Sequence, residues 1–253
     1  MLSKIGKYKN VAEPFHCDFH RELFMGHLGN HLLNAADFHS NDRGFGMVFL
    51  NTINKTWVLS RLVIEMDEMP MIYDEFYVET WVENAMRYFT HRNFHISNAD
   101  GKTLGWGRSI WAMIDTRSRQ PVNLFDIKDG EINEWVDNEK TAPIERPSRV
   151  KMSDKAELVY AYKARYNDVD MNGHVNSVKS IEHVLDIFPT DIFRQKRVKR
   201  FDIAYVAESH AGDTLRFYKE FGANENEVLV RISKITDECE TECVRSIVTF
   251  VDR

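Results

Sequence analysis

The 253-residue sequence is poor in residues that break or cross-link a chain, with 12 glycines, 6 prolines and 3 cysteines. So few glycines and prolines exclude a collagen-like or low-complexity chain. The odd number of cysteines leaves at least one thiol without a disulfide partner, and no histidine stands close to Cys239 and Cys243 to complete a zinc site. We therefore expect free thiols and a reducing compartment.

Long apolar runs and an excess of positive charge are also missing. A membrane-spanning helix needs about 20 apolar residues in succession, and the N-terminal MLSKIGKYKN lacks the apolar core of a secretory signal. The 33 basic and 39 acidic residues give a net charge of −6, which disfavours nucleic acid as the main partner. We expect a soluble cytoplasmic protein without a membrane or nucleic-acid partner.

The residues that are present form a pattern of two helices and several strands. Apolar residues recur at helical spacing over residues 21–38 and 176–188, and Pro189 ends the second pattern. The apolar stripe of the first helix consists of Phe24, Leu28, Leu32 and Ala35. β-branched and aromatic residues predict strands over 75–83, 109–115, 214–222, 228–233 and 246–252.

The two halves of the chain repeat each other. GRSIWAMID, ending at Asp115, matches VRSIVTFVD, ending at Asp252, and Asp74 and Asp213 precede similar strands. A similar dipeptide, Cys17-Asp18 or Asn167-Asp168, precedes each helix. Both halves then run short strand, long helix, several strands, which is typical of an antiparallel sheet wrapped around one long central helix.

This repeat predicts an α+β protein with two domains. The segment 126–149 is charged and broken by prolines, so it predicts a linker between the two repeats. We assign residues 1–130 to the first domain, 131–153 to the linker and 154–253 to the second domain.

One polar cluster stands directly before the second helix. Asp170, Asn172 and His174 occupy alternate positions, so their side chains would point to the same side of an extended segment. An Asn amide, a titrating His and an orienting Asp, beside the unpaired N–H groups of a helix start, suit acyl transfer or hydrolysis. A polar helix entry, with Asp168 or Asn172 as the cap and His174 on the surface, explains the same residues.

The segment NDVDMNGHVNSVKSIEHVLD resembles the Asp-x-Asn-x-His-Val-Asn motif of the plant and bacterial acyl-acyl carrier protein (acyl-ACP) thioesterases. The likeness extends, in order, to WVLSRLVIEMDEMPMIYDEFYVETWVE, GRSIWAMIDTRSRQPVNL and FDIAYVAESHAGD. It implies a tandem (double) hotdog fold, in agreement with the repeat, and hydrolysis of fatty acyl-ACP to a free fatty acid and holo-ACP. The first hotdog would mainly house the acyl chain. It has CDFHRELFMGH in place of the motif, so we expect one site per chain.

Carried over by position, the resemblance makes Asp170, Asn172 and His174 catalytic and adds Glu208, which spacing alone would not select. Ser209 follows Glu208 where plant relatives often have Cys, and a hydroxyl needs far stronger activation than a thiol. We therefore expect attack by water, with Asn172 and helix N–H groups polarising the carbonyl and Asp170 orienting the cluster. Glu208 and His174 would position and deprotonate the water. No metal or cofactor is expected.

A basic run on an otherwise acidic chain is a candidate docking site. Acyl carrier proteins are strongly acidic, so the resemblance implies docking on Arg194, Lys196, Arg197, Lys199 and Arg200. A solvated loop without a partner explains the run equally well. Two fused hotdogs can form the usual pair within one chain, which leaves a monomer and a homodimer open.

Three other functions fit the same fold. An acyl-CoA thioesterase shares the chemistry with a different carrier, and a 3-hydroxyacyl dehydratase fits the paired Glu208 less well. A non-catalytic acyl-ligand sensor needs no catalytic cluster and usually carries an effector module. The sequence shows no plastid-type transit segment, so we expect a bacterial protein.

Overall fold

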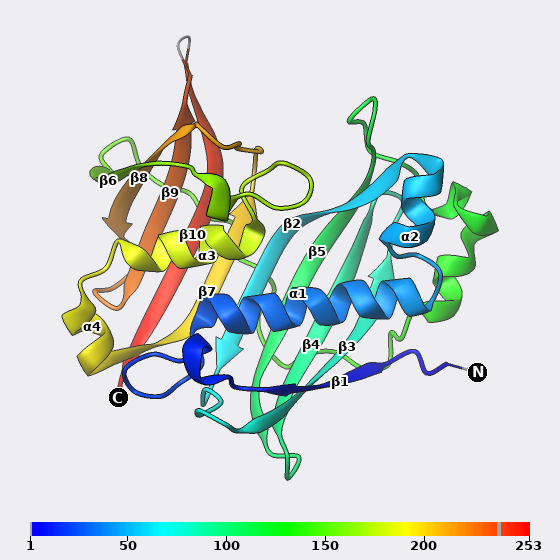
Figure 1. Ribbon diagram of the computed structural model, residues 1–253, viewed down its shortest axis with the longest axis horizontal. Helices are drawn as coiled ribbons and strands as arrows, with labels where there is room; N and C mark the ends of the chain where they lie inside the picture. Colours follow the sequence, from blue (N-terminus) through cyan, green and yellow to red (C-terminus); the bar gives the residue numbers. More distant parts are fainter. Residues whose placement is uncertain (1, 237–238) are drawn as a thin grey trace. The chain divides into compact units, whose positions relative to one another are not determined.

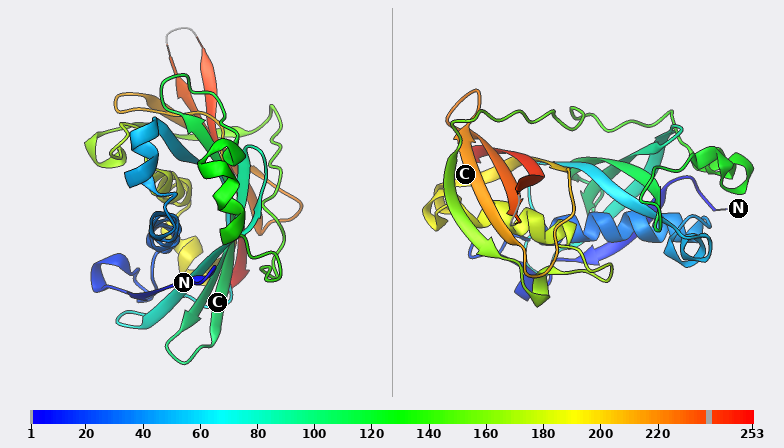
Figure 2. Two further views of the ribbon diagram at one scale, coloured as in Figure 1. Left: turned by 90° about the vertical axis from the view of Figure 1, so that its right-hand side faces the viewer. Right: turned by 90° about the horizontal axis from the view of Figure 1, so that it is seen from above.

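The computed structural model describes residues 2–236 and 239–253, and the chain divides into two compact units, Met1–Arg146 and Pro147–Arg253. In each unit an antiparallel sheet packs against one main helix (Figures 1 and 2). This confirms the α+β architecture and the tandem repeat. No helix in the described part of the chain has the length and apolar character that crossing a membrane requires.

The first unit is built around α1, which lies against a sheet with the order β1-β3-β4-β5-β2. Its elements are β1 (Gly6–Val11), η1 (Pro14–His16), α1 (Met25–Asp42), α2 (Met47–Leu50), η2 (Asn51–Ile53), β2 (Lys55–Met66), β3 (Glu75–Ala85), β4 (Phe89–Asn98), β5 (Thr103–Asp115), η3 (Leu124–Asp126) and η4 (Lys128–Trp135). Leu28 and Leu32 of α1 are 0% exposed. A Cβ at Gly107 of β5 would lie 3.1 Å from Phe94 Cδ2 and 3.4 Å from Leu32 Cδ1, so a glycine suits this tightly packed point under the helix.

The second unit repeats this topology with the order β6-β8-β9-β10-β7 around α3. Its elements are β6 (Glu157–Lys163), η5 (Tyr166–Asp168), α3 (Ser177–Asp186), α4 (Thr190–Gln195), β7 (Lys196–Tyr205), β8 (Thr214–Phe221), β9 (Glu227–Ile235) and β10 (Glu240–Asp252). Each strand occupies the place of its counterpart in the first unit. Asp74 and Asp213 also correspond, because the carboxylate of each accepts a 2.9 Å hydrogen bond from a backbone N–H three residues earlier.

Each predicted strand coincides with a strand of the structure, although the prediction over 214–222 runs one residue past the end of β8. The helix predicted over 176–188 is α3 with Asn176 as its N-cap. The first helix begins four residues later than predicted, at Met25. Arg21 adopts a left-handed backbone (φ 67°), which delays the helix. Phe24 therefore stands before the helix and is 48% exposed, so its assignment to the apolar stripe is wrong.

The boundary between the two units falls after Arg146, within the segment predicted as a linker. The beginning of that segment packs into the first unit, because Ile132 of η4 is 4% exposed and contacts a buried apolar cluster. The cluster also contains Phe45, Leu50, Met113, Leu124 and Ile127. The charged residues around Ile132 conceal this contact in the sequence.

We expect Leu32→Ala to lower the free energy of unfolding by about 2–5 kcal/mol, because it removes a fully buried side chain between helix and sheet. Phe24→Ala is the control on the same predicted stripe, and its cost should be about 1 kcal/mol or less. Urea titrations of the two variants and the wild type measure both values. Equal losses would contradict the assignment of Phe24 to the surface.

Candidate active site

Residues 170–174 form a tight turn that the carboxylate of Asp170 organises. Asp170 Oδ1 accepts the backbone N–H of Asn172 (2.8 Å) and of His174 (3.3 Å). The N–H of Asp170 donates to the carbonyl of His174 (2.9 Å), and Gly173 donates to Asp170 with a left-handed φ of 81°. The segment is therefore not extended. The expectation that three side chains line one side of an extended strand is wrong, because these hydrogen bonds fold the chain.

The turn brings His174 next to Glu208, although the two are far apart in the sequence. His174 Nε2 lies 3.4 Å from Glu208 Oε2, and the side chains are 25% and 37% exposed. Val175 donates to the carbonyl of Ser209 (2.7 Å), which pairs the end of the turn with the residue after Glu208. Lys234 Nζ donates to the carbonyl of Glu208 (2.8 Å) and holds this segment against β9. A base and a carboxylate thus share an accessible site.

The hydrogen-bond donors of the turn are mostly occupied. All three backbone N–H groups of residues 172–174 donate to Asp170, so the exposed side-chain amide of Asn172 is the donor that the turn presents to solvent. Within the described residues, the carboxylate of Asp170 engages the backbone and not the ring of His174. Asp170 therefore shapes the turn, whereas we expected it to orient the imidazole.

The helix after the turn has its own cap. Asn176 Oδ1 accepts the N–H of Val178 (2.8 Å), so neither Asp168 nor Asn172 is the N-cap of α3. Tyr205 of β7 donates its hydroxyl to the carbonyl of Ser177 (2.8 Å) and ties the helix start to the sheet. Burial raises the pKa of Tyr205, which keeps it a neutral donor.

The sequence interpretation assigned no role in the candidate site to three further residues: His210, Asp168 and His183. His210 stacks edge-on against His174, with ring centroids 5.1 Å apart. Asp168 is 4% exposed and accepts a hydrogen bond from His183 of α3, whose Nε2 lies 3.0 Å away. Aligning the repeats through Asp74 and Asp213 would have drawn attention to His210, which stands three residues before Asp213.

Burial and hydrogen bonding oppose each other in the Asp168–His183 pair. Burial raises the pKa of Asp168, but hydrogen bonds from Arg165, Tyr162 and His183 lower it below its ordinary value. Burial lowers the pKa of His183, but hydrogen bonds to Asp186 and Asp168 raise it above 6.5. Both shifts favour the charged forms, a carboxylate on Asp168 and an imidazolium on His183.

The first unit contains the same turn without the same side chains. Asp18 Oδ1 accepts the N–H of His20 (2.8 Å) and of Glu22 (3.1 Å), and Arg21 takes the left-handed position. The counterpart of Asp18 is therefore Asp170, and the pairing of Cys17-Asp18 with Asn167-Asp168 inferred from the sequence is wrong. The backbone hydrogen bonds show that Asp18 corresponds to Asp170, which the similarity of the two dipeptides had concealed.

The His174–Glu208 pair has no counterpart in this first turn. Glu22 stands where the second unit has His174. The carbonyl of Pro70 accepts a hydrogen bond from the N–H of Leu23 (2.9 Å), as the carbonyl of Ser209 does from the N–H of Val175. Pro70 therefore corresponds to Ser209, and Met69 stands at the position of Glu208. The described residues therefore contain this base and carboxylate in one unit only, as expected for one site per chain.

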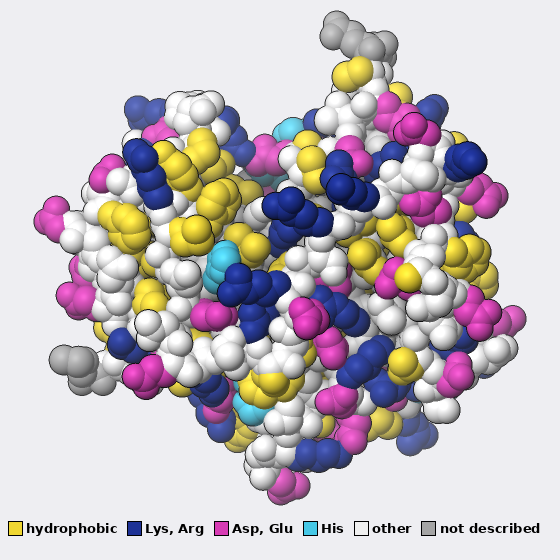
Figure 3. Space-filling view, turned by 180° about the vertical axis from the view of Figure 1, so that it is seen from behind, with side chains coloured by type: hydrophobic (Ala, Val, Ile, Leu, Met, Phe, Trp, Pro, Cys, Tyr) yellow, Lys and Arg dark blue, Asp and Glu magenta, His cyan; other side chains and the backbone are white. Residues whose placement is uncertain are grey.

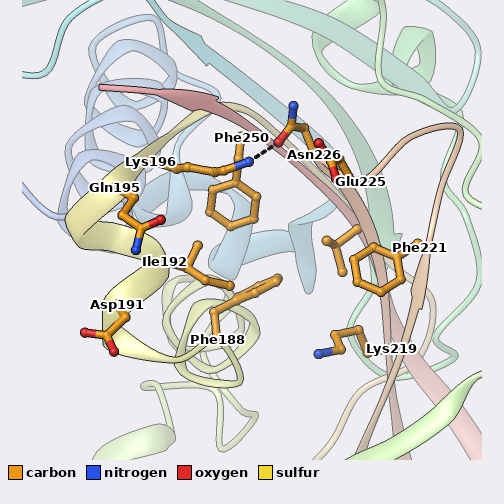
Figure 4. A pocket seen from close by; sticks show the side chains of 11 residues that line it. Phe188, Asp191, Ile192, Gln195, Lys196, Lys219, Phe221, Glu225, Asn226 and Phe250 are labelled. Atoms are coloured by element: carbon orange, nitrogen blue, oxygen red, sulfur yellow. Dashed lines mark hydrogen bonds between the residues drawn. The ribbon is translucent and has the colours of Figure 1, made fainter.

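A separate apolar pocket lies at the other end of α3. Phe188, Ile192 and Phe250 line it together with Lys196, which is hydrogen-bonded to Asn226 (Figure 4). Its volume is about 190 Å³, and none of the four predicted catalytic residues lines it. No group of three or more His, Cys, Asp or Glu side chains within residues 2–236 and 239–253 is arranged to hold a metal ion.

Two repeats of a sheet wrapped around a helix define a double-hotdog protein. Residues 10–129 match the model of the acyl-ACP thioesterase N-terminal domain, and residues 151–250 match that of the C-terminal domain. The chain belongs to the acyl-ACP thioesterase family.

Relatives at several levels of sequence identity support the assignment to this family. A crystal structure of an acyl-ACP thioesterase from Bacteroides thetaiotaomicron is 49% identical, with a TM-score of 0.90 over 98% of both chains. The dodecanoyl-[acyl-carrier-protein] hydrolase of Cinnamomum camphora is 28% identical over 189 residues, which are 71% of this chain and 50% of that protein. The chain spans about half the length of the curated relatives it matches. A 12:0-ACP thioesterase from Umbellularia californica, 19% identical with a TM-score of 0.87 over 100% of this chain and 99% of that one, shares the fold.

We expect the stability that His183 contributes to be fully present below pH 6.5 and to be lost as pH rises through its raised pKa. The difference in unfolding free energy between wild type and His183→Gln, measured by urea titration across this range, should therefore shrink with rising pH. His31→Gln is the control, because burial lowers the pKa of His31. The difference in unfolding free energy between wild type and His31→Gln should grow with rising pH up to 6.5. The same trend in both variants would contradict the assigned pKa directions.

Proposed function

We propose that this chain hydrolyses the thioester of fatty acyl-ACP to a free fatty acid and holo-ACP. The observation that carries the proposal is the His174–Glu208 pair, with Asn172 two residues before His174 in the same turn, within the segment that matches the family's C-terminal domain. We also propose that the protein is a cytoplasmic enzyme that needs no cofactor and works as a monomer or homodimer.

The proposed reaction is general-base attack by water. Glu208 and His174 together position a water molecule that lies beside the pair, and one of them accepts its proton as its oxygen adds to the thioester carbonyl. The amide of Asn172, with backbone N–H groups at the start of α3, stabilises the charge that develops on the carbonyl oxygen. The tetrahedral intermediate then breaks its carbon–sulfur bond, and the proton passes to the departing phosphopantetheine thiolate. Asp170 contributes by holding the turn.

The observations favour this function over its rivals. An acyl-ligand sensor has no use for an accessible base and carboxylate 3.4 Å apart. A dehydratase removes a proton from the carbon next to the carbonyl and expels a hydroxyl group, whereas the two family models that match this chain are those of thioesterases. An acyl-CoA thioesterase shares the chemistry, and the names of the curated relatives favour the acyl carrier protein as the carrier.

We expect His174→Ala and Glu208→Ala each to lower kcat by about two orders of magnitude or more, because each removes a partner in proton transfer. Thiol release from a panel of acyl-ACPs and matched acyl-CoAs measures the effect. His20→Ala is the control, because His20 occupies the position of Asn172 in the first unit, and it should leave turnover within about twofold.

The outcomes separate the hypotheses. Faster turnover of the acyl-CoAs would support the same catalytic site but would identify coenzyme A, rather than acyl carrier protein, as the acyl carrier. Tight acyl binding without turnover would indicate a sensor. A loss in His20→Ala as large as that in His174→Ala would contradict a single site per chain.

We also propose that acyl carrier protein docks on the basic run of Arg194, Lys196, Arg197, Lys199 and Arg200. Three of these residues lie within ion-pair distance of carboxylates: Arg194 with Asp191 (3.5 Å), Lys196 with Asp252 (3.7 Å) and Arg200 with Asp202 (2.7 Å). Basic side chains lie beside acidic ones across the face shown in Figure 3. Because these three carboxylates offset part of the positive charge of the run, we expect its exposed members to steer the acidic partner rather than to form a strong static bond.

We expect Arg194→Ala to raise KM for acyl-ACP about two- to fivefold at low salt and to leave kcat unchanged. The Arg194 side chain is 62% exposed, and its ion pair with Asp191 is exposed too, so folding should be little affected. The effect should fade at high salt, because mobile ions screen the attraction. Lys102→Ala removes a comparably exposed, ion-paired lysine of the first unit and should not change KM. Equal effects of the two variants would refute docking at the run.

A further inference from the structure

A buried carboxylate stands two residues before the catalytic turn. Asp168 is 4% exposed, and both of its side-chain oxygens are occupied. Oδ2 accepts the Tyr162 hydroxyl (2.7 Å) and the Arg165 N–H (2.6 Å), and Oδ1 accepts His183 Nε2 (3.0 Å). One side chain thus joins β6, η5 and α3.

The backbone of the same residue closes the base of the turn. The carbonyl of Asp168 accepts the N–H of Asn176 (2.8 Å), and Val169 and Val175 form an antiparallel bridge directly inside that contact. Residues 170–174 therefore project from a base with Asp168 on one side and the N-cap of α3 on the other. Any shift of Asp168 relative to α3 would move His174 relative to Glu208.

The first unit has the same turn with different chemistry at its base. The positions of Asp168 and His183 are held there by His16 and His31. His31 Nδ1 lies 2.9 Å from the amide oxygen of Asn10. The carboxylate of Glu13, whose side chain is 48% exposed, lies 3.2 Å from His16 Nδ1 and 3.9 Å from His31 Nε2. Burial lowers the pKa of His31, opposite in direction to that of His183. The fold therefore forms without a buried ion pair at these positions.

We propose that Asp168 and His183 are positioning residues for the catalytic turn: their buried ion pair locks the base of the turn to α3 and keeps His174 in register with Glu208. The proposal rests on the proposed hydrolase function. It explains why the ion pair is present in the unit that carries the catalytic pair, whereas the first unit holds the same backbone with weaker, partly exposed contacts. Tyr162 supports the pair, because its hydroxyl bonds Asp168 and its ring lies 4.9 Å from that of His183.

Removal of either partner should lower kcat about 10- to 100-fold and leave KM nearly unchanged, because small misplacement of reacting groups weakens the chemical step more than binding. The variants are Asp168→Asn and His183→Leu. His183→Gln should recover part of the loss, since its amide can still donate to Asp168. Tyr162→Phe keeps the ring and removes one donor, so its loss should be smaller than that of Asp168→Asn.

The matched control is His31→Leu, which removes the histidine at the same position of the first unit. The two side chains are similarly buried, with His31 15% and His183 13% exposed. Turnover in His31→Leu should stay within about twofold of wild type. Thermal unfolding of each variant shows whether it is folded at the assay temperature, and Tyr162→Phe and His183→Gln provide tests if the harsher variants unfold.

A second readout does not depend on turnover. Hydrogen exchange of the Asn172 and His174 amides, which are bonded to Asp170, should accelerate about tenfold or more in Asp168→Asn and His183→Leu but not in His31→Leu. Unchanged kcat and unchanged exchange in the folded variants would overturn the proposal. A fall in kcat of similar size in His31→Leu would also overturn the proposal. If wild type has no thioesterase activity, the proposed function fails and the exchange measurement alone decides the positioning role.

Discussion

The candidate site depends on a turn at residues 170–174, which backbone hydrogen bonds to the carboxylate of Asp170 hold in shape. Asp170 Oδ1 accepts two of them, and the resulting turn carries His174 to Glu208. A carboxylate suits this task because it accepts several donors and remains ionised near neutral pH. Without the turn, the residues of the motif would be three polar side chains ahead of a helix and would form no site.

The same turn in the first unit shows how a duplicated frame can diverge in function. Asp18 makes equivalent bonds there, and the sheet around it has the same strand order. The differences are confined to side chains, with Glu22 in place of His174 and Met69 in place of Glu208. The backbone hydrogen bonds are the same in both turns, and a few substitutions on this shared frame suffice to bring a histidine and a carboxylate together in one of them.

The base of the turn shows a second divergence, in electrostatics. A buried ion pair stabilises a structure only when its geometry satisfies both charges, because burial itself opposes ionisation. Asp168 meets this condition with three donors, and His183 is further supported by Asp186. Such a pair gives rigidity and directionality, which matter more beside reacting groups than elsewhere in the fold.

The sequence by itself determined the α+β class, the tandem repeat, every strand that it predicted and the helix after the motif, because apolar periodicity and capping residues are local signals. The resemblance supplied Glu208, which no local pattern selects. Only the tertiary structure decided that the motif is a turn, that Asp170 binds backbone rather than the His174 ring, and that Asp168 pairs with His183. It also showed that Phe24 is exposed and that Ile132 belongs to a core. These features depend on contacts between distant segments, and periodicity carries no information about which distant side chains meet.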